Sequence, residues 1–172
     1  MRKNRVLIMT TGGTIEKSYS EEDGSIVNRE PVFKDKLLKR LRLPYTEVEV
    51  SQIMAKDSLD MTEADRLLIY DCIEKAIAEG FQCIVVLHGT DTLEKTVGVC
   101  FKKNPSPKAA VIFTGAMRPA GFDDSDAQQN FTEALYSAQI VGHGFYVSFH
   151  GHLFKAPQVT KDKERKTFIQ KK

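Results

Sequence analysis

The sequence has no apolar stretch of the roughly 18 residues that a membrane-spanning helix needs. Its basic N-terminal segment contains only a short apolar run, Val6 to Met9, and no small-residue cleavage site follows, so the segment does not fit a signal peptide. We therefore expect a cytoplasmic protein with no membrane partner, in which the first apolar run is a β-strand.

Cysteine is scarce. The three residues, Cys72, Cys83 and Cys100, are widely spaced and lie in apolar contexts, which fits neither a disulfide framework nor a zinc site. His150 and His152 share one face of a predicted strand but lack a third ligand. We expect buried thiols in a reducing compartment, and neither a metal nor another cofactor.

The chain also lacks a strong net charge. Its 25 basic and 23 acidic residues sum to +2, which argues against a nucleic-acid-binding surface over the whole molecule. Positive charge gathers only in residues 161–172, where six Lys or Arg accompany two Asp or Glu. We expect residues 160–172 to form a solvated, partly frayed basic tail, and we expect no nucleic-acid partner.

Short apolar runs alternate with helical patterns along the 172 residues, without repeats or low-complexity segments. The length and the 41% hydrophobic content suit a single domain over residues 1–172. Five runs predict strands: 5–10, 47–53, 83–87, 109–113 and 145–149. Residues 153–159 predict a further strand or hairpin. Four segments predict helices: 30–41, 62–80, 92–102 and 126–140. This alternation predicts an α/β fold, an open, mostly parallel sheet flanked by helices with right-handed crossovers.

Glycine, hydroxyl and carboxylate groups follow four of the predicted strands. These segments are Thr10–Thr14, Lys56–Asp60, His88–Thr92 and Thr114–Pro119. Each one alone fits a tight turn or a helix cap. Open α/β sheets, however, bind ligands beyond the carboxyl ends of their strands, so the coincidence of four such loops predicts a functional site there.

Three motifs make this pattern specific. Thr-Gly-Gly-Thr-Ile (11–15), His-Gly-Thr-Asp-Thr-Leu (88–93) and Thr-Gly-Ala-Met-Arg-Pro (114–119) resemble the bacterial-type L-asparaginase family. Asp-Ser-Leu-Asp-Met (57–61) and Val-Thr-Lys (159–161) occur in the order found in that family. The resemblance implies the fold of the N-terminal domain of L-asparaginases. It also implies an amidohydrolase that converts L-asparagine to L-aspartate and ammonia without a cofactor, and whether L-glutamine is a further substrate is left open.

The resemblance also implies catalytic roles. Thr14, directly after the glycine turn, corresponds to a threonine nucleophile, which a neighbouring base must activate. Tyr19 is assigned as a proton relay by its proximity to Thr14. Thr90, Asp91 and Lys161 correspond to a triad in which Thr90 activates water or itself attacks the amide. Which threonine attacks first is left open.

Substrate recognition is expected to follow the charges of the amino-acid head group. Asp91 would pair with the α-ammonium group, and Ser58 with nearby backbone N–H groups would hold the α-carboxylate. Leu59 stands where some family members have glutamine. The full set of expected substrate-binding residues is Gly13, Asp57, Ser58, Leu59, Gly89, Thr90, Asp91 and Ala116.

Two other functions remain open. A chain with this pocket could be a non-catalytic amino-acid-binding module, or an aminoacyl-tRNA amidotransferase-type subunit. Full-length members of the family carry a smaller C-terminal domain, so the resemblance implies a short form without it. A homo-oligomer is also expected, because a single α/β layer often pairs by two-fold symmetry.

Overall fold

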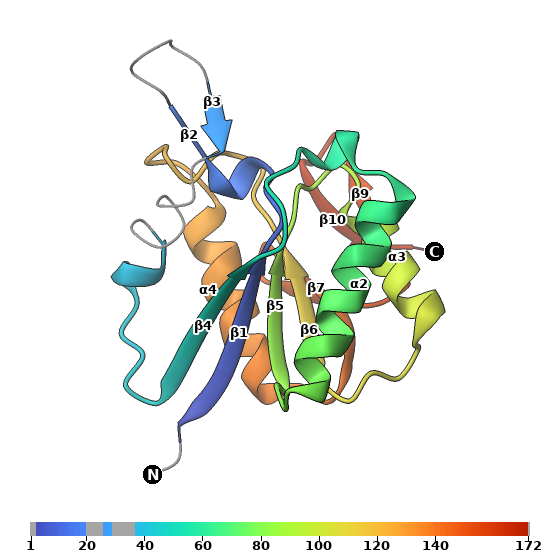
Figure 1. Ribbon diagram of the computed structural model, residues 1–172. Helices are drawn as coiled ribbons and strands as arrows, with labels where there is room; N and C mark the ends of the chain where they lie inside the picture. Colours follow the sequence, from blue (N-terminus) through green and yellow to red (C-terminus); the bar gives the residue numbers. More distant parts are fainter. Residues whose placement is uncertain (1–2, 20–25, 29–36, 172) are drawn as a thin grey trace.

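A six-stranded sheet with helices on both faces organises the protein (Figure 1). The structure is a computed structural model, and it describes residues 3–19, 26–28 and 37–171. The strands of this sheet are β1 (Asn4–Thr10), β4 (Thr46–Gln52), β5 (Cys83–Leu87), β6 (Ala110–Thr114), β7 (Gly144–Phe149) and β8 (His152–Lys155). The α-helices are α2 (Glu63–Ala78), α3 (Leu93–Lys103) and α4 (Ala127–Ile140). Two small hairpins are formed by β2 (Lys17–Tyr19) with β3 (Ile26–Asn28), and by β9 (Val159–Asp162) with β10 (Thr167–Gln170). Short 3-10 helices cover η1 (Thr14–Glu16), η3 (Leu38–Arg40) and η4 (Ser58–Asp60).

The strand order confirms the predicted open, mostly parallel sheet. It is β4-β1-β5-β6-β7-β8, with all neighbours parallel except β8, which pairs antiparallel with β7. The chain leaves β1 toward one edge, to β4, and then returns to β5 on the other side of β1. The loops that follow β1 and β5 therefore start at a point where the direction of the connections reverses, which is where open α/β sheets bind ligands.

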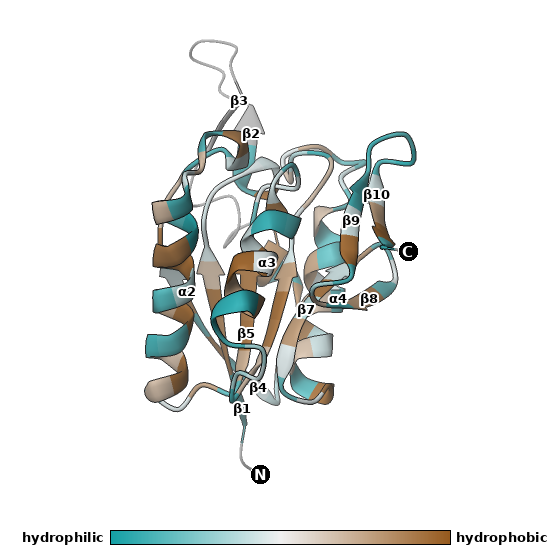
Figure 2. Ribbon diagram, turned by 90° about the vertical axis from the view of Figure 1, so that its right-hand side faces the viewer, coloured by the Kyte–Doolittle hydropathy of each residue, from teal (hydrophilic) through white to brown (hydrophobic). Residues whose placement is uncertain are grey.

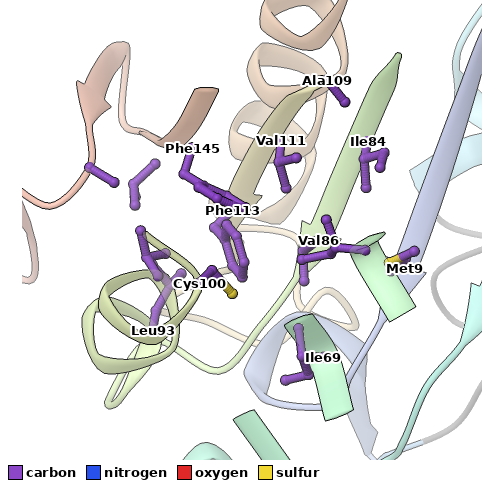
Figure 3. Close-up of a cluster of buried hydrophobic side chains, with 14 of the residues drawn as sticks. Met9, Ile69, Ile84, Val86, Leu93, Cys100, Ala109, Val111, Phe113 and Phe145 are labelled. Atoms are coloured by element: carbon purple, nitrogen blue, oxygen red, sulfur yellow. The ribbon is translucent and has the colours of Figure 1, made fainter. Parts of the chain in front are cut away.

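Two apolar clusters bury the two faces of the sheet. Because successive side chains in a strand point to opposite faces, Leu7 and Met9 pack beneath α2 and α3, whereas Val6 and Ile8 pack beneath α4. Figure 3 shows the first cluster, in which Phe113 lies beside the buried thiol of Cys100. In Figure 2 the strands are predominantly hydrophobic, while the helices outside them carry both polar and apolar residues. The sheet thus forms a rigid base for the loops at its carboxyl ends.

The prediction that every crossover is right-handed is wrong for one connection. The chain passes from β5 to β6 through α3, and from β6 to β7 through α4, moving in the same direction across the sheet. Yet α3 and α4 lie on opposite faces (Figure 1), so the two connections have opposite hands. The α2 and α3 crossovers are right-handed and the α4 crossover is left-handed, a rare arrangement. On its face, α4 covers β1, β5, β6 and β7, and Leu37 and Leu38 pack in the same cluster.

The expectation of a frayed basic tail is also wrong. Residues 159–162 and 167–170 form the antiparallel β9–β10 hairpin, and Phe168 is buried. The ring of Phe168 packs edge-on against that of Phe149 in β7, with 5.0 Å between ring centroids. This long-range apolar contact orders a segment whose composition alone indicates a solvated terminus.

A capping box opens α2, because Thr62 and Asp65 exchange hydrogen bonds between side chain and backbone N–H. The helix predicted over residues 30–41 lies mostly outside the described residues, and the described part contains only the 3-10 turn Leu38–Arg40. Within the described part of the chain, no helix is long and apolar enough to cross a membrane, and no group of metal-binding side chains occurs.

Candidate active site

The loop after β1 places Thr14 at the carboxyl edge of the sheet, at the top of Figure 1. Gly12 and Gly13 both adopt left-handed backbone angles, with φ of +93° and +91°. A side chain on Gly13 would lie 2.5 Å from the Cα of Gly89, so the loops after β1 and β5 touch through two glycines. The residues that follow these glycines, Thr14 and Thr90, therefore extend from adjacent backbone positions.

Ser58 completes this contact from the loop after β4. A Cβ on Gly89 would lie 2.6 Å from the Oγ of Ser58, so glycine is required for this approach. Thr92 donates its hydroxyl to the carbonyl of Ser58 at 2.7 Å instead of capping α3 with its side chain. The Oγ of Ser58 is buried and has no hydrogen-bond partner among the described residues. The loop after β4 is thus held against the loop after β5 with one hydroxyl unused.

A lysine from the C-terminal hairpin meets the loop after β5. The Nζ of Lys161 donates to the Oγ1 of Thr90 at 2.8 Å and to the Oδ1 of Asp91 at 2.7 Å. Thr90 is almost fully buried, whereas the Asp91 side chain is 44% exposed and the Lys161 side chain 15%. The structure therefore brings together three of the residues expected in the site, although 70 positions of sequence separate Lys161 from Asp91.

The position of Lys161 depends on α3. The carboxylate of Glu94, in the first turn of α3, accepts a hydrogen bond at 2.8 Å from the backbone N–H of Lys161. Glu94 thereby links the strand that carries the lysine to the helix that begins directly after Thr90 and Asp91. The motifs that suggested the site did not indicate Glu94, and its only sequence signal is an acidic residue in the first turn of a helix.

A buried carboxylate supports the turn before Thr14. Glu16 is almost fully buried, and its Oε2 accepts a hydrogen bond from the N–H of Gly12 at 2.5 Å. The backbone N–H of Glu16 in turn donates to the carbonyl of Gly13 at 3.1 Å. Glu16 was not anticipated as part of the site, and the structure shows it as the residue that folds the glycine turn back on itself.

An ion pair closes the other side of the same turn. The Nζ of Lys17 donates to the Oδ2 of Asp57 at 2.8 Å, and the Oδ1 of Asp57 accepts from the N–H of Leu59. The hydrogen bond from Lys17, followed by that from the Leu59 backbone, lowers the pKa of Asp57. Asp57 is therefore an anion that caps the η4 turn. The Leu59 side chain is 71% exposed.

His88 is a packed, hydrogen-bonded residue. It is fully buried, its Nε2 lies 2.8 Å from the Oγ1 of Thr96, and its Nδ1 lies 2.8 Å from the carbonyl of Gly89. Burial lowers the pKa of His88 to about 4, so the ring is neutral at physiological pH. Its geometry supports the loop after β5 from beneath and gives it no access to solvent.

The loop after β6 lies against the same group of residues. Ala116 is buried, and a Cβ on Gly115 would lie 3.3 Å from the Cγ2 of Thr90. The carboxylate of Asp126 accepts hydrogen bonds at 3.0 Å from the N–H groups of both Met117 and Arg118. The loop is thereby fixed to the start of α4. Arg118 pairs with Asp124, one of the partners expected for it.

A polar network that the motifs did not reveal connects this loop to the hairpin. Asp126 contacts the Nε2 of His150 at 2.9 Å and accepts from the side-chain amide of Asn130 at 2.8 Å. The Nδ1 of His150 lies 3.0 Å from the hydroxyl of Thr167 in β10. Burial acts to raise the pKa of Asp126, but the Met117, Arg118 and His150 hydrogen bonds lower it overall. The network ties the hairpin that carries Lys161 to the sheet.

Tyr19 is the one expected catalytic residue whose side chain lies outside the described residues. Its backbone belongs to β2, which pairs with β3 and begins three residues after Thr14. The remaining expected residues gather at one edge of the sheet. They belong to the four loops that follow β1, β4, β5 and β6, and to the β9–β10 hairpin.

Comparisons with known proteins agree with this geometry. Residues 5–169 match the family model described as asparaginase, N-terminal. The chain is 29% identical over 160 residues to an L-asparaginase of Thermococcus kodakarensis, covering 91% of this chain and 47% of that protein. It is 33% identical over 134 residues to one of the subunits of the glutamyl-tRNA(Gln) amidotransferase of Pyrobaculum aerophilum, covering 76% of this chain and 31% of that protein.

Solved structures show the same similarity. The thermostable L-asparaginase from Thermococcus kodakarensis superposes with a TM-score of 0.82 at 27% identity, covering 96% of this chain and 51% of that one. A probable cytoplasmic L-asparaginase from Campylobacter jejuni superposes with a TM-score of 0.75 at 28% identity, covering 92% of this chain and 48% of that one. The chain thus spans about half the length of these structures and less than half of both curated relatives. The family model extends over nearly all residues of the chain. The chain therefore belongs to the asparaginase family and corresponds to the N-terminal part of its members.

Proposed function

We propose that this chain hydrolyses the side-chain amide of L-asparagine to L-aspartate and ammonia through a threonine nucleophile. One observation carries the proposal: the Nζ of Lys161 lies within hydrogen-bonding distance of both Thr90 Oγ1 and Asp91 Oδ1. A lysine held against a buried hydroxyl provides a proton acceptor in its neutral form, which is what activation of a weak oxygen nucleophile requires. Family membership and the L-asparaginases among the relatives support the same reaction.

In the first step Thr14 is the nucleophile. Its Oγ1 adds to the amide carbon, the C–N bond breaks, and the departing nitrogen takes the proton that the hydroxyl gives up. Tyr19 is proposed as the group that relays this proton. The backbone N–H of Gly13 is suited to stabilise the oxyanion, because that of Gly12 already donates to Glu16. The products of this step are ammonia and an aspartyl ester on Thr14.

In the second step the triad activates water. Thr90 accepts a proton from the water molecule while its own hydroxyl proton passes to the neutral amine of Lys161, with Asp91 stabilising the resulting ammonium. The water oxygen adds to the ester carbon, and the C–O bond to Thr14 breaks. The departing Thr14 oxygen takes a proton from Thr90, which recovers one from the Lys161 ammonium. Aspartate leaves, both threonine hydroxyls are restored and Lys161 is again the neutral amine. The route uses only protein groups and water.

Substrate binding is proposed to follow the expected charge pattern. The exposed carboxylate of Asp91 is available to the α-ammonium group, and the unpaired Oγ of Ser58 is available to the α-carboxylate. Charge-assisted hydrogen bonds of this kind contribute about 1.5–3 kcal/mol each. Gly13, Gly89 and Ala116 would form the walls, with Asp57 and Leu59 beside Ser58. L-Glutamine, one methylene longer, is proposed as a poorer substrate.

A second candidate function is that of a tRNA-dependent amidotransferase subunit. The observation that favours it is the 33% identity to the Pyrobaculum aerophilum protein of that description. The third candidate function is a non-catalytic amino-acid-binding module. For the hydrolase we further infer a cytoplasmic protein in which residues 1–172 fold as one domain and assemble into a homo-oligomer.

Steady-state ammonia release with L-asparagine and L-glutamine tests the proposal. We expect release from L-asparagine without RNA, and a loss of about a hundredfold or more in Thr14→Ala and in Thr90→Ala. Mass spectrometry should detect an aspartyl adduct on Thr14 in the Thr90→Ala variant, because only the second step is blocked there. Thr132→Ala, which removes an exposed hydroxyl on α4, is the control.

The alternatives give different results. Ammonia release that requires tRNA indicates the amidotransferase subunit. Binding of L-asparagine by calorimetry without any release indicates the binding module. Near-normal turnover of either threonine variant would contradict the role given to that residue.

A further inference from the structure

Three lysines of the β9–β10 hairpin border one hollow. Lys161 lies in β9, where it pairs with Phe168 across the hairpin. Lys163 and Lys166 lie at the two ends of the turn that joins β9 to β10.

These lysines line a hollow with the loop after β6. The hollow has a volume of about 360 Å³ and is bordered by Met117, Arg118, Lys161, Lys163 and Lys166. Four of its five lining residues carry positive charge, and we call it the cationic hollow. Only Lys161 belongs to the proposed catalytic machinery.

The positive charge of the cationic hollow is only half compensated. Arg118 pairs with Asp124, and Lys161 pairs with Asp91. Among the described residues, neither Lys163 nor Lys166 has a carboxylate partner, and both are exposed. Both border the same hollow, and like charges at such close range repel one another. An anion between them would remove this repulsion.

Both walls of the cationic hollow are fixed before any ligand binds. The Oδ1 of Asp162 accepts hydrogen bonds at 3.0 Å from the N–H groups of Glu164 and Arg165, which shapes the turn of the hairpin. On the other wall, Asp126 holds the N–H groups of Met117 and Arg118. A preformed arrangement of cations lowers the entropic cost of binding an anion.

We propose that the cationic hollow is a binding site for a small organic phosphate, separate from the amide-binding site. The Arg118 guanidinium presents a planar fork that matches a phosphate group, and the lysines act as point charges around it. Met117 supplies an apolar, adaptable surface for the organic part of the ligand. The volume lies in the range of sites for small organic ligands, which commonly have about 300–1,000 Å³.

Occupation of the cationic hollow has a consequence for catalysis, and this consequence rests on the proposed function. Lys161 borders the hollow and also donates to Thr90. A phosphate beside its Nζ would compete with Thr90 for its hydrogens. The ligand should therefore slow the water-activating step.

Calorimetric titration with ADP, at low ionic strength, tests the site independently of catalysis. We expect ADP to bind the unmodified chain with a Kd below about 1 mM. Binding should weaken about tenfold or more in Lys163→Glu/Lys166→Glu and stay within about twofold in Lys102→Glu/Lys103→Glu. The second pair lies on the exposed end of α3 and changes the net charge equally. Lys163→Gln/Lys166→Gln, checked for folding by circular dichroism, should weaken binding in the same direction.

Three titration results would overturn the site: no binding of ADP, equal weakening in both charge-reversed pairs, or binding of a short single-stranded RNA without binding of ADP or pyrophosphate. In the kinetic arm, ADP should inhibit ammonia release by the unmodified chain but not by Lys163→Gln/Lys166→Gln. Binding of ADP without inhibition would overturn the coupling to Lys161. An absence of ammonia release under all conditions would instead count against the proposed function, while the titration still decides the site.

Discussion

At the scale of single residues, the site depends on backbones that approach without side chains between them. Gly13 and Gly89 touch, and Gly89 also lies against Ser58, so three loops from three strands meet within a small volume. Into this volume the structure places one amine, that of Lys161, against a buried hydroxyl. The chemistry we propose is therefore sensitive to one atom, the Nζ of Lys161.

Replacing Lys161 by methionine should abolish most of the proposed activity with little effect on stability. The substitution keeps the aliphatic stem but removes the donor to Thr90 and Asp91. Loss of one such catalytic group costs about a hundredfold or more in kcat. The measurement is ammonia release from L-asparagine, with Lys102→Met, at the exposed end of α3, as the control. Equal activity in both variants would remove Lys161 from the mechanism.

His88 should make stability depend on mildly acidic pH. Its pKa in the folded chain is about 4, against an ordinary value of 6.5, so the unfolded chain binds a proton in this interval that the folded chain does not. Stability is therefore complete above about pH 6.5 and decreases as the pH falls toward 4, by about 3 kcal/mol in total.

Urea unfolding between pH 7.5 and 4.5 measures this dependence. The variant His88→Gln, which keeps an amide near Thr96, should show a flatter dependence on pH, whereas His143→Gln at an exposed position should not change the slope. An identical slope in the chain with and without His88 would show that the buried ring is not the titrating group.

At the scale of elements, the β9–β10 hairpin is the part that completes the site. The ring of Phe168 packs against that of Phe149 in β7, and the hydroxyl of Thr167 is hydrogen-bonded to His150. The N–H of Lys161 donates to the carboxylate of Glu94 in α3. None of these contacts is local in sequence. The hairpin and its lysine therefore become ordered only after the sheet and α3 are in place.

The variant Phe168→Ala should uncouple the hairpin from the sheet. Removing a buried phenylalanine side chain costs about 3–5 kcal/mol in the free energy of unfolding, and here it also releases the strand partner of Lys161. Ammonia release should fall at temperatures where far-UV circular dichroism still shows a folded chain. Ile169→Ala, half-buried on the opposite face of β10, should lose much less activity. Full activity of Phe168→Ala would mean that the hairpin needs no such anchor.

At the scale of the whole molecule, self-association is the expected state. Among the residues that the structure describes, six large apolar side chains are exposed: Tyr45, Leu59, Leu68, Phe122, Tyr136 and Ile140. The strand β4 also lies at the edge of the sheet, where unpaired backbone groups favour a further partner. Sedimentation equilibrium should therefore give a multiple of the 19.4 kDa chain mass. A single species at the chain mass across the micromolar range would contradict this expectation.

Local patterns along the chain were enough to establish the main elements and the composition of the site. Alternation of buried runs with amphipathic segments predicted β1, β4, β5, β6 and β7, because the period of apolar residues is a local property. The motifs after β1, β5 and β6, together with Val159–Lys161, indicated the residues that the structure gathers at one edge, including the pairing of Lys161 with Thr90 and Asp91.

Three features became visible only in the folded chain: the hand of the α4 crossover, the order of the C-terminal hairpin, and the residues that support the site from outside the motifs. The left-handed connection depends on which face α4 covers, and the hairpin depends on Phe168 finding Phe149. Glu16 bonds to Gly12 only four positions away, whereas Glu94 and His150 act through partners 67 and 24 positions away. Contacts of the second kind form between residues whose proximity exists only after folding, so no local pattern in the sequence encodes them.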